Sequence, residues 1–343
     1  MAYTTIDDPS QYFQVATWSG NASNQAITND GNSDLQPDWL WIKARNEASD
    51  HALLDSTRGL TKRIHSNTTD QETNDSSATV SSFDSDGFTM TQYNVANDSD
   101  DTGVAWQWKA NGGTTSSNSD GSITSTVQAN TTAGFSIVTY TGAGGNQTIG
   151  HGLGVVPKWI LIKRRDDAGD WTGYHSVLGD EKFMRLNSGN AVGDQATYFN
   201  DTTPTSTVFT VGNAGDVNYS TGTHVAYCFA EIQGYSKFGS YKGNGSSTVT
   251  EGPFIYTGFK PAWTMIKRSD SASDGWYIHD STRSPNNVID KAFRANADNA
   301  ESGENIDFLS NGFAIRIGAN NNFNNASGTY IYMAFAEHPF VSS

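Results

Sequence analysis

Short apolar runs separated by polar turn residues recur along the whole chain. The runs are rich in Val, Ile, Thr, Tyr, Phe and Trp, and the breaks between them are rich in Gly, Asn, Asp and Ser. This pattern is typical of β-strands and their turns. Asp86 and Gly87, like Asn311 and Gly312, stand directly before such a run and predict hairpin turns, because glycine accepts a positive φ. Residues 288–300 instead favour one short surface helix.

One motif occurs three times: a proline, one further residue, a tryptophan, a mainly apolar run and a lysine. It spans residues 37–43, 157–163 and 261–267, so the repeating unit is about 105–120 residues long. In each copy an aromatic run precedes the motif. A second apolar run, a short segment with an internal basic residue and a closing aromatic strand follow it. The repeat predicts an all-β fold of three tandem jelly-roll-like β-sandwich modules.

Composition places the module boundaries. Residues 111–131 are rich in Gly, Ser and Asn and are interpreted as a flexible linker between a first module, 1–110, and a second module, 132–241. The third module is predicted to span residues 242–343. Residues 234–241 carry several aromatic side chains and predict an ordered strand, which could complete either the second or the third module.

The charge balance narrows the classes of function. The 343 residues include 36 acidic and 21 basic side chains, which gives a formal net charge of −15. Charged residues make up only 17 % of the chain, against about a quarter in ordinary globular proteins, and aromatic residues make up 12 %. Low charge with many aromatics is the reverse of a disordered composition, so the chain is expected to fold. An acidic surface repels phosphate backbones, so nucleic acid is not an expected partner.

The sequence also gives no indication of membrane insertion, secretion, a disulfide or a transition-metal site. No run of apolar residues approaches the 18 or so that span a bilayer, so no membrane insertion is predicted. Residues 1–8 have neither a basic nor an apolar signal segment, so secretion is not expected. A single cysteine, Cys228, excludes an intrachain disulfide and is interpreted as a small buried, inert thiol. The seven histidines lack metal-ligand spacing, so no transition-metal site is predicted.

The three motif tryptophans, Trp39, Trp159 and Trp263, are predicted to be structural core residues. An exposed ring at the start of a strand would suit a sugar-stacking platform. Their position inside apolar runs favours the core instead.

A second repeated feature suggests a polar ligand site. Asp-Ser-Thr-Arg occurs at residues 55–58 and 280–283, while the second copy has His175 and Leu178 in the corresponding places. An Asp–Arg constellation could bind a polar ligand, and the plainer interpretation is a turn with a local ion pair. The candidate ligand-binding residues are Asp55, Arg58, Asp280, Arg283, Trp171 and Trp276.

Catalysis and metal binding have weaker sequence support. His175 beside Ser176 could suggest a hydrolase, but no nucleophile elbow is present and no acid is placed to orient the histidine. Carboxylate clusters at residues 84–86, 98–101 and 166–167 could hold calcium, although none has EF-hand spacing. We therefore predict no catalytic residues and no cofactor, with calcium as the one open alternative.

Four stretches carry a resemblance to a known group of proteins. Residues 234–241 and 252–263, together with 308–313 and 328–337, resemble a repeat in virion proteins of tailed phages that infect marine bacteria. Those proteins are usually described as tail-fibre-like or uncharacterised structural proteins, and the similarity covers essentially the whole chain. The family supplies no catalytic residues to carry across.

The resemblance implies a function, a location and partners. It implies a phage virion structural protein, first of all a tail fibre or tip module that contacts the host cell surface, assembled in the host cytoplasm. The alternative is a capsid decoration or head-fibre protein. Implied partners are other virion proteins and a host surface glycan or receptor. Phage fibre proteins commonly form trimers, so we expect a homotrimer with Tyr235, Phe238 and Tyr241 at least partly buried between modules or chains.

A polysaccharide depolymerase is the less favoured alternative. Such an enzyme needs two carboxylates that face one cleft. No acidic pair recurs in all three copies of the repeat, so the chain is not expected to be an enzyme.

Overall fold

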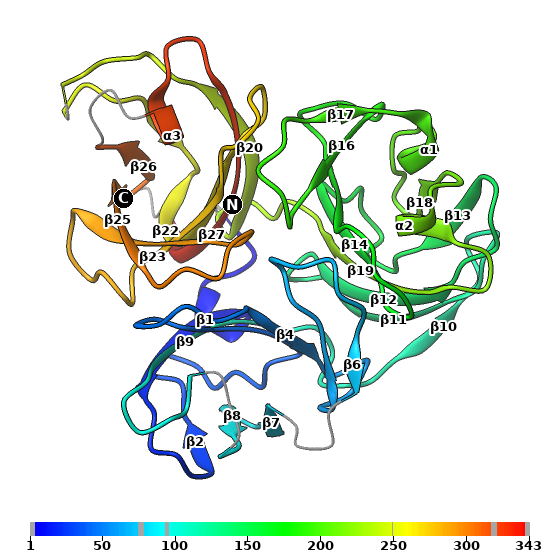
Figure 1. Cartoon of the computed structure of the whole chain (residues 1–343), viewed down its shortest axis with the longest axis horizontal. Coiled ribbons are helices and arrows are strands. Elements are labelled where there is room, and N and C mark those ends of the chain that lie inside the picture. The colour runs from blue at the N-terminus through cyan, green and yellow to red at the C-terminus, as the bar shows by residue number, and fades with distance from the viewer. Residues whose placement is uncertain (1–3, 75–78, 93–95, 249, 317–320, 340–343) are drawn as a thin grey trace.

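The structure is a computed structural model, and it describes residues 4–74, 79–92, 96–248, 250–316 and 321–339. The described chain is all-β, as predicted, with three very short α-helices and one 3-10 helix. Figure 1 shows three lobes around a common centre, in chain order from blue through green to red.

The first lobe contains a four-stranded antiparallel sheet in the order β1-β9-β3-β4. Its strands are β1 (Phe13–Ser19), β9 (Thr102–Trp108), β3 (Trp39–Ala44) and β4 (Ala52–Asp55). A three-stranded sheet, β2-β8-β7, and a strand pair, β5-β6, accompany it. These smaller elements, with the 3-10 helix η1, are β2 (Gln25–Ile27), β8 (Gly87–Met90), β7 (Val80–Asp84), β5 (Lys62–Arg63), β6 (Thr73–Asn74) and η1 (Pro9–Gln11).

The second lobe contains an eight-stranded sheet in the order β10-β11-β12-β19-β14-β15-β16-β17, with the pair β13-β18 beside it. Its strands are β10 (Ser116–Asn118), β11 (Ser125–Asn130), β12 (Phe135–Thr141), β19 (Thr223–Phe229), β14 (Trp159–Arg164), β15 (Thr172–His175), β16 (Lys182–Arg185), β17 (Gly193–Asp194), β13 (Gln147–Gly150) and β18 (Val208–Val211). Two four-residue helices, α1 (Ala196–Phe199) and α2 (Gly215–Asn218), complete it.

The third lobe contains a nearly closed, barrel-like sheet in the order β20-β27-β22-β23-β24-β25-β26-β21. Its elements are β20 (Ser236–Lys242), β27 (Thr329–Pro339), β22 (Phe259–Arg268), β23 (Trp276–Asp280), β24 (Ile289–Arg294), β25 (Ser302–Leu309), β26 (Gly312–Ile315), β21 (Phe254–Tyr256) and helix α3 (Asn321–Asn324).

One arrangement of four strands recurs in all three lobes. The strands that carry the motif, β3, β14 and β22, each lie between a closing aromatic strand and the strand that follows the motif. The registers also correspond, because Trp39 pairs with Trp108, Trp159 with Phe229 and Trp263 with Phe335. The sequence repeat is therefore a repeat of strand pairing.

The two faces of each motif strand pack against different cores. Trp39 and Trp41 belong to a central cluster that all three lobes share, whereas Leu40 and Ile42 pack into an outer cluster of the first lobe alone. Successive side chains of a strand point to opposite faces, so a sheet buried on both faces needs a continuous apolar run. The second and third lobes each have their own outer cluster in the same way.

The motif tryptophans meet in the central cluster. All three are 0 % exposed, and Trp39 of the first lobe stacks on Tyr227 of the second, with ring centroids 4.3 Å apart. Trp108 of the first lobe lies edge-on to Trp263 of the third, at 5.5 Å. The indole nitrogens of the three motif tryptophans have no hydrogen-bond partner among the described residues. These rings therefore act through packing.

Two sequence-based assignments are corrected by the strand pairing. Residues 111–131 are not a structureless linker, because β10 and β11 lie within them and extend the second sheet. Ser125, Val127 and Gln128 of β11 are buried, which the Gly/Ser/Asn-rich composition of the segment did not indicate. Residues 288–300 contain β24, not a helix, since neighbouring strands pair with it on both sides.

Two other expectations about local structure are resolved. The strand predicted near residues 234–241 is β20, and it pairs with β27, so it completes the third sheet. The two predicted hairpin turns are confirmed, because Asp84 pairs with Gly87 and Leu309 pairs with Gly312. Gly87 has a φ of +99°, which only glycine adopts readily.

Candidate functional site

The predicted ligand-binding residues lie where neighbouring lobes meet. We call the contact between the first and second lobes the first junction, that between the second and third the second junction, and that between the third and first the third junction. The side chains of Asp55 and Arg58 are 0 % exposed at the first junction, and those of Asp280 and Arg283 are 0 % exposed at the third.

At the first junction a buried ion network joins two lobes. Asp55 pairs with Arg58, and the Tyr227 hydroxyl of the second lobe donates to the Asp55 carboxylate at 2.7 Å. Arg58 also bonds Glu72 at 2.9 Å, and Arg165 of the second lobe reaches the same carboxylate at 2.8 Å. Each buried charge is thus matched by an opposite one, and the two arginines hold the pKa of Glu72 below its usual value although burial acts to raise it.

The third junction contains the corresponding network. Trp106 Nε1 of the first lobe donates to Asp280 at 2.9 Å, in the place of the Tyr227 hydroxyl. Glu301 receives Arg283 at 3.4 Å and Arg45 of the first lobe at 3.0 Å. The two networks have the same order of charges, and each crosses from one lobe to the next.

The second junction lacks this network. His175, Leu178, Val192 and Ser269 stand in the places of the aspartate, the first arginine, the glutamate and the second arginine. His175 instead donates from Nε2 to the Tyr332 carbonyl of the third lobe at 3.3 Å. All four charges have been lost together, which indicates that they act as one unit.

Two kinds of hydrogen bond recur at all three junctions, one from a backbone N–H group and one from a side-chain ring nitrogen. One backbone N–H of each lobe donates to a carbonyl of the next lobe: Glu72 to Arg165, Val192 to Ser269 and Glu301 to Arg45, each at 2.9 Å. One ring nitrogen donates in the opposite direction: Trp171 Nε1 to His65 O at 2.7 Å, Trp276 Nε1 to Arg185 O at 2.9 Å and His51 Nε2 to Arg294 O at 3.0 Å. The three lobes therefore close into a ring.

The motif lysines serve the same junctions. Lys163 donates to the Thr69 carbonyl of the first lobe at 2.9 Å, and Lys267 donates to the Gly189 carbonyl of the second at 3.2 Å. Lys43 is equally buried and lies 5.2 Å from the ring of Phe293 of the third lobe. Burial lowers the pKa of all three ammonium groups to about 8.

The candidate ligand-binding residues thus form contacts between lobes. Trp171 and Trp276 are 0 % exposed and donate their indole N–H groups across a junction. Asp55, Arg58 and the equivalent pair at the third junction have buried partners for their charges. This placement favours the ion-pair interpretation over a ligand site.

Lowering the pH from 7 to 5 is expected to destabilise this ring. Burial lowers the pKa of His51 to about 3 and that of His175 to about 4, against about 6.5 in an unfolded chain. His51 accepts from Trp41 Nε1 at Nδ1, so protonation there would set two donors face to face. The unfolded state takes up these protons first, so stability present above pH 6.5 is lost as the pH falls, by about 2 kcal/mol per histidine at pH 5.

Urea unfolding at pH 7 and pH 5 checks this expectation. H175Q should remove the His175 share of the loss, about 2 kcal/mol, because glutamine keeps a donor for Tyr332 and does not titrate. H338Q, at an exposed histidine, is the matched control and should leave the dependence as it is. Equal stability of the unaltered chain at the two pH values would contradict the expectation.

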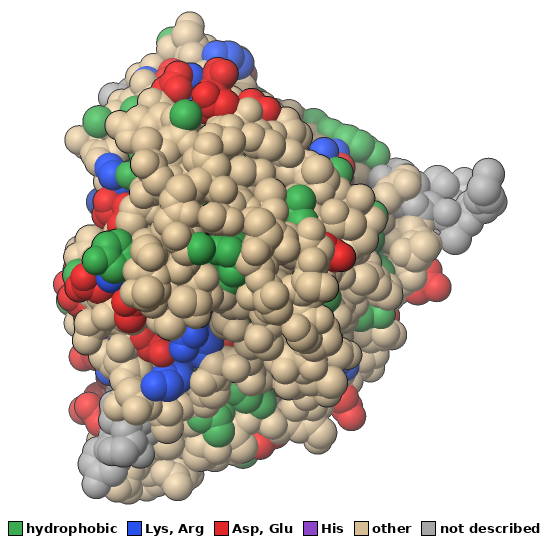
Figure 2. Space-filling model, turned by 90° about the vertical axis from the view of Figure 1, so that its right-hand side faces the viewer, with side chains coloured by type: hydrophobic (Ala, Val, Ile, Leu, Met, Phe, Trp, Pro, Cys, Tyr) green, Lys and Arg blue, Asp and Glu red, His purple; other side chains and the backbone are tan. Residues whose placement is uncertain are grey.

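The surface seen from the side of the second lobe offers no broad apolar or single-sign patch. Figure 2 shows a face of mainly uncharged polar groups, with separate small groups of acidic and basic side chains and scattered hydrophobic ones. The most exposed large hydrophobic residues of the described chain are Tyr256 at 55 % and Tyr219 at 50 %.

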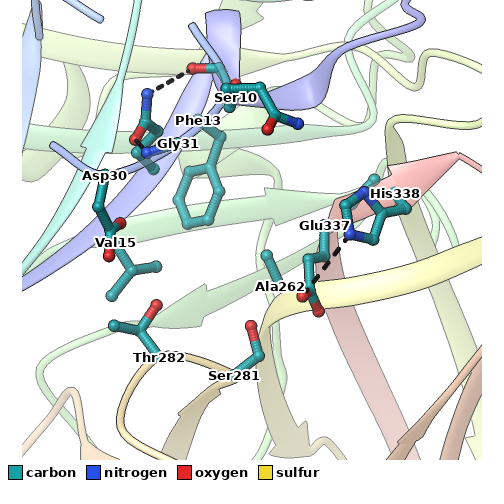
Figure 3. A pocket seen from close by; sticks show the side chains of 13 residues that line it. Ser10, Phe13, Val15, Asp30, Gly31, Ala262, Ser281, Thr282, Glu337 and His338 are labelled. Atoms are coloured by element: carbon teal, nitrogen blue, oxygen red, sulfur yellow. Dashed lines mark hydrogen bonds and ion pairs between the residues drawn. The ribbon is translucent and has the colours of Figure 1, made fainter. Parts of the chain in front are cut away.

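A pocket of about 220 Å³ lies at the third junction, outside the buried ion network (Figure 3). One wall comes from η1 and β1, and the opposite wall comes from the ends of β22, β23 and β27. Its main lining residues are Ser10, Phe13, Val15, Asp30, Ala262, Ser281, Thr282, Glu337 and His338.

The pocket is lined mainly by polar and charged groups that could bind a polar ligand. Glu337 pairs with Lys260 at 2.8 Å, and His338 Nε2 lies 3.9 Å from the same carboxylate. Asp30 adds a second acid, and Ser281 and Thr282 add hydroxyl groups. The Phe13 ring contributes little apolar surface, since it is 3 % exposed and stacks on Phe335 with centroids 5.3 Å apart.

Comparison with known proteins places the whole chain in one family. A family model described as "Domain of unknown function (DUF7483)" matches residues 8–339. The chain belongs to the DUF7483 family. No curated protein and no solved structure matches the DUF7483 chain. Among its described residues, no helix is long and apolar enough to cross a membrane.

The calcium hypothesis gains no site in the described part of the DUF7483 chain. There, no three His, Cys, Asp or Glu side chains lie close enough together to hold a metal ion. Asp84 accepts hydrogen bonds from Ser82 and Thr89, and Asp166 pairs with Arg164. Calcium binding stays an untested alternative. Cys228 is fully buried, as predicted, and burial raises the pKa of its thiol.

Sequence reasoning missed the partners that complete the junctions of the DUF7483 chain. Arg45, Arg165 and Ser269 each stand two residues after a motif lysine, and aligning the three copies would have revealed the missing charge in the third. The pocket at the third junction had no sequence signal, because its walls come from opposite ends of the chain.

Proposed function

We propose that the chain is a non-enzymatic structural protein of a phage virion, acting as a tail fibre or tip module that contacts the host cell surface. One observation carries the proposal on the structural side. The repeated charged and histidine side chains, Asp55–Arg58, Asp280–Arg283 and His175, form contacts that join the three lobes into a ring. They therefore stabilise a rigid body and do not form a reactive site. The phage assignment itself rests on the sequence resemblance.

We also propose that the three lobes are β-sandwich modules of the jelly-roll type, descended from one repeat. The recurring four-strand order and the separate outer clusters support this view. A capsid decoration or head-fibre role would use the same rigid body and stays the alternative.

Partners follow from the same proposal. Other virion proteins would anchor the module, and a host glycan or receptor would be its external target. The homotrimer stays a prediction. Tyr235 and Phe238 are buried between lobes, as expected, because Tyr235 lies edge-on to Tyr12 of the first lobe at 6.0 Å and Phe238 lies 6.2 Å from the ring of Phe229 of the second. Tyr241 stacks on Tyr330 within the third lobe at 4.8 Å. These contacts lie within one chain, so they do not bear on trimer formation.

Gold-labelled antibody against the purified chain, applied to phage particles from cells that carry the gene, tests the location. We expect label at the tail end of the particles. Label on the head supports the decoration alternative, and particles without label contradict the virion assignment.

Incubating the chain with host polysaccharide tests the depolymerase alternative. New reducing ends would favour that alternative, and Asp30 and Glu337 would then be the first acids to substitute.

A further inference from the structure

We propose that the pocket at the third junction binds an extended segment of a partner polypeptide, which adds to the free edge of β1 and places a carboxamide side chain against Ser281 and Thr282. The chain contains its own filled copy of this site at the first junction. The inference does not depend on the virion assignment.

The first and second sheets differ at one edge. β1 corresponds to β12, because Phe13 pairs with Trp108 as Phe135 pairs with Phe229. In the second sheet β11 covers the outer edge of β12, with Gln128 opposite Ile137. In the first sheet, within the described residues, β1 is the end strand and pairs with β9 alone. The pocket follows this edge through Phe13, Gln14 and Val15.

The second observation is how the first junction is filled. Gln128 of β11 is fully buried, and its Nε2 donates to Ser56 Oγ at 2.9 Å and to Thr57 Oγ1 at 2.7 Å. Its Oε1 accepts from the backbone N–H groups of Asn111 at 3.0 Å and Gly113 at 2.8 Å. One carboxamide from a strand at the edge of β12 therefore holds the two hydroxyls of the neighbouring lobe.

The third observation is that the same hydroxyls line the pocket. Ser281 and Thr282 take the places of Ser56 and Thr57, since Ser281 N donates to Ala262 O as Ser56 N donates to Asp38 O, both at 2.9 Å. At the first junction the Asp38 carboxylate also receives three backbone N–H groups of residues 110–113. Alanine at position 262 has no carboxylate to hold such a turn, and the pocket lies at this place among the described residues.

The lining indicates what kind of segment fits. Exposed strand edges pair with added strands through main-chain hydrogen bonds, and side-chain pockets supply specificity. Asp30 favours N–H donors and basic neighbours and opposes acidic ones, while the charge of Glu337 is matched by Lys260. Phe13 is only 3 % exposed, so it offers no accessible ring on which a sugar could stack. A neutral or basic strand with a glutamine is therefore the favoured occupant.

The test uses a peptide copied from the filled site. A fluorescein-labelled, end-capped hexapeptide with the sequence of residues 125–130, Ser-Thr-Val-Gln-Ala-Asn, is titrated with the full chain and followed by fluorescence anisotropy. We expect saturable binding. Replacing the glutamine of the peptide by alanine should weaken binding at least about fivefold, because the hydroxyls lose their partner. T282V in the protein should weaken binding by a similar factor.

The matched control is T57V, the same change at the filled copy, which should leave the Kd of the peptide unchanged. Thermal melts of both variants verify that they fold. Absence of binding at millimolar peptide overturns the proposal. So does a result in which T57V weakens binding and T282V does not, because the peptide would then be replacing β11. Oligosaccharide binding that is sensitive to T282V, without peptide binding, would also overturn it.

Discussion

R58M is expected to lower the free energy of unfolding by about 3–5 kcal/mol. The guanidinium is fully buried and pairs with Asp55 and Glu72. Its loss leaves the buried Asp55 carboxylate without its counter-charge, while Glu72 keeps Arg165. Methionine preserves much of the volume, so the loss reports on charge. Burial acts to lower the pKa of Arg58, but the Asp55 and Glu72 carboxylates outweigh it and hold that pKa above its usual value. The effect of R58M should therefore be the same at pH 7 and at pH 9.

The second junction supplies the control. L178M changes the corresponding position where the network is absent, and swaps of similar apolar volume usually cost under about 1.5 kcal/mol. Urea unfolding of the two variants beside the unaltered chain gives the comparison. If R58M and L178M lose the same small amount, the ion network does not stabilise the ring.

W39A is expected to cost about 3–5 kcal/mol and to loosen two lobes at once. The ring of Trp39 stacks on Tyr227 at 4.3 Å and on Phe135 at 5.9 Å, both in the second lobe. Removing it opens a cavity in the cluster that all lobes share. Hydrogen exchange should therefore become faster in β19 of the second lobe as well as in β3.

A tryptophan on the outer face gives the matched comparison for W39A. Trp18 packs edge-on to Phe88 at 5.7 Å in the outer cluster of the first lobe. W18A should speed exchange in the first lobe and leave β19 protected. Exchange confined to the first lobe in both variants would mean that the central cluster does not couple the lobes.

The repeat motif predicted the positions of the central strands correctly, because an apolar run follows a proline at the same place in each of the three copies. β3 and β14 begin at the motif tryptophan, and β22 begins at Phe259, just before the motif. The pattern could not reveal which face looks toward the other lobes, since the run of apolar residues from Trp39 to Ile42 is buried on both sides. Composition also hid β10 and β11, which pair with each other and with β12 although the segment is rich in Gly, Ser and Asn.

The candidate site was less accessible to sequence reasoning. The Asp-Ser-Thr-Arg pattern marked the right residues, but their partners Tyr227 and Trp106 lie 172 and 174 positions away. No local pattern encodes such contacts. The helix expected at residues 288–300 failed for a similar reason, because β23 and β25 on either side hold Ile289 and Phe293 in a strand.

Closure of the ring also sets an order for folding during synthesis. The salt bridge between Arg45 and Glu301 joins residues 256 positions apart, so the third junction cannot form until the last strands have left the ribosome. Phe13 and Trp108 receive their cover from Trp263 and Phe335 only then. Contacts of such long sequence separation form slowly, and an uncovered apolar face favours aggregation in the interval. Until then the first lobe presents to solvent the apolar face that the third lobe covers in the finished ring.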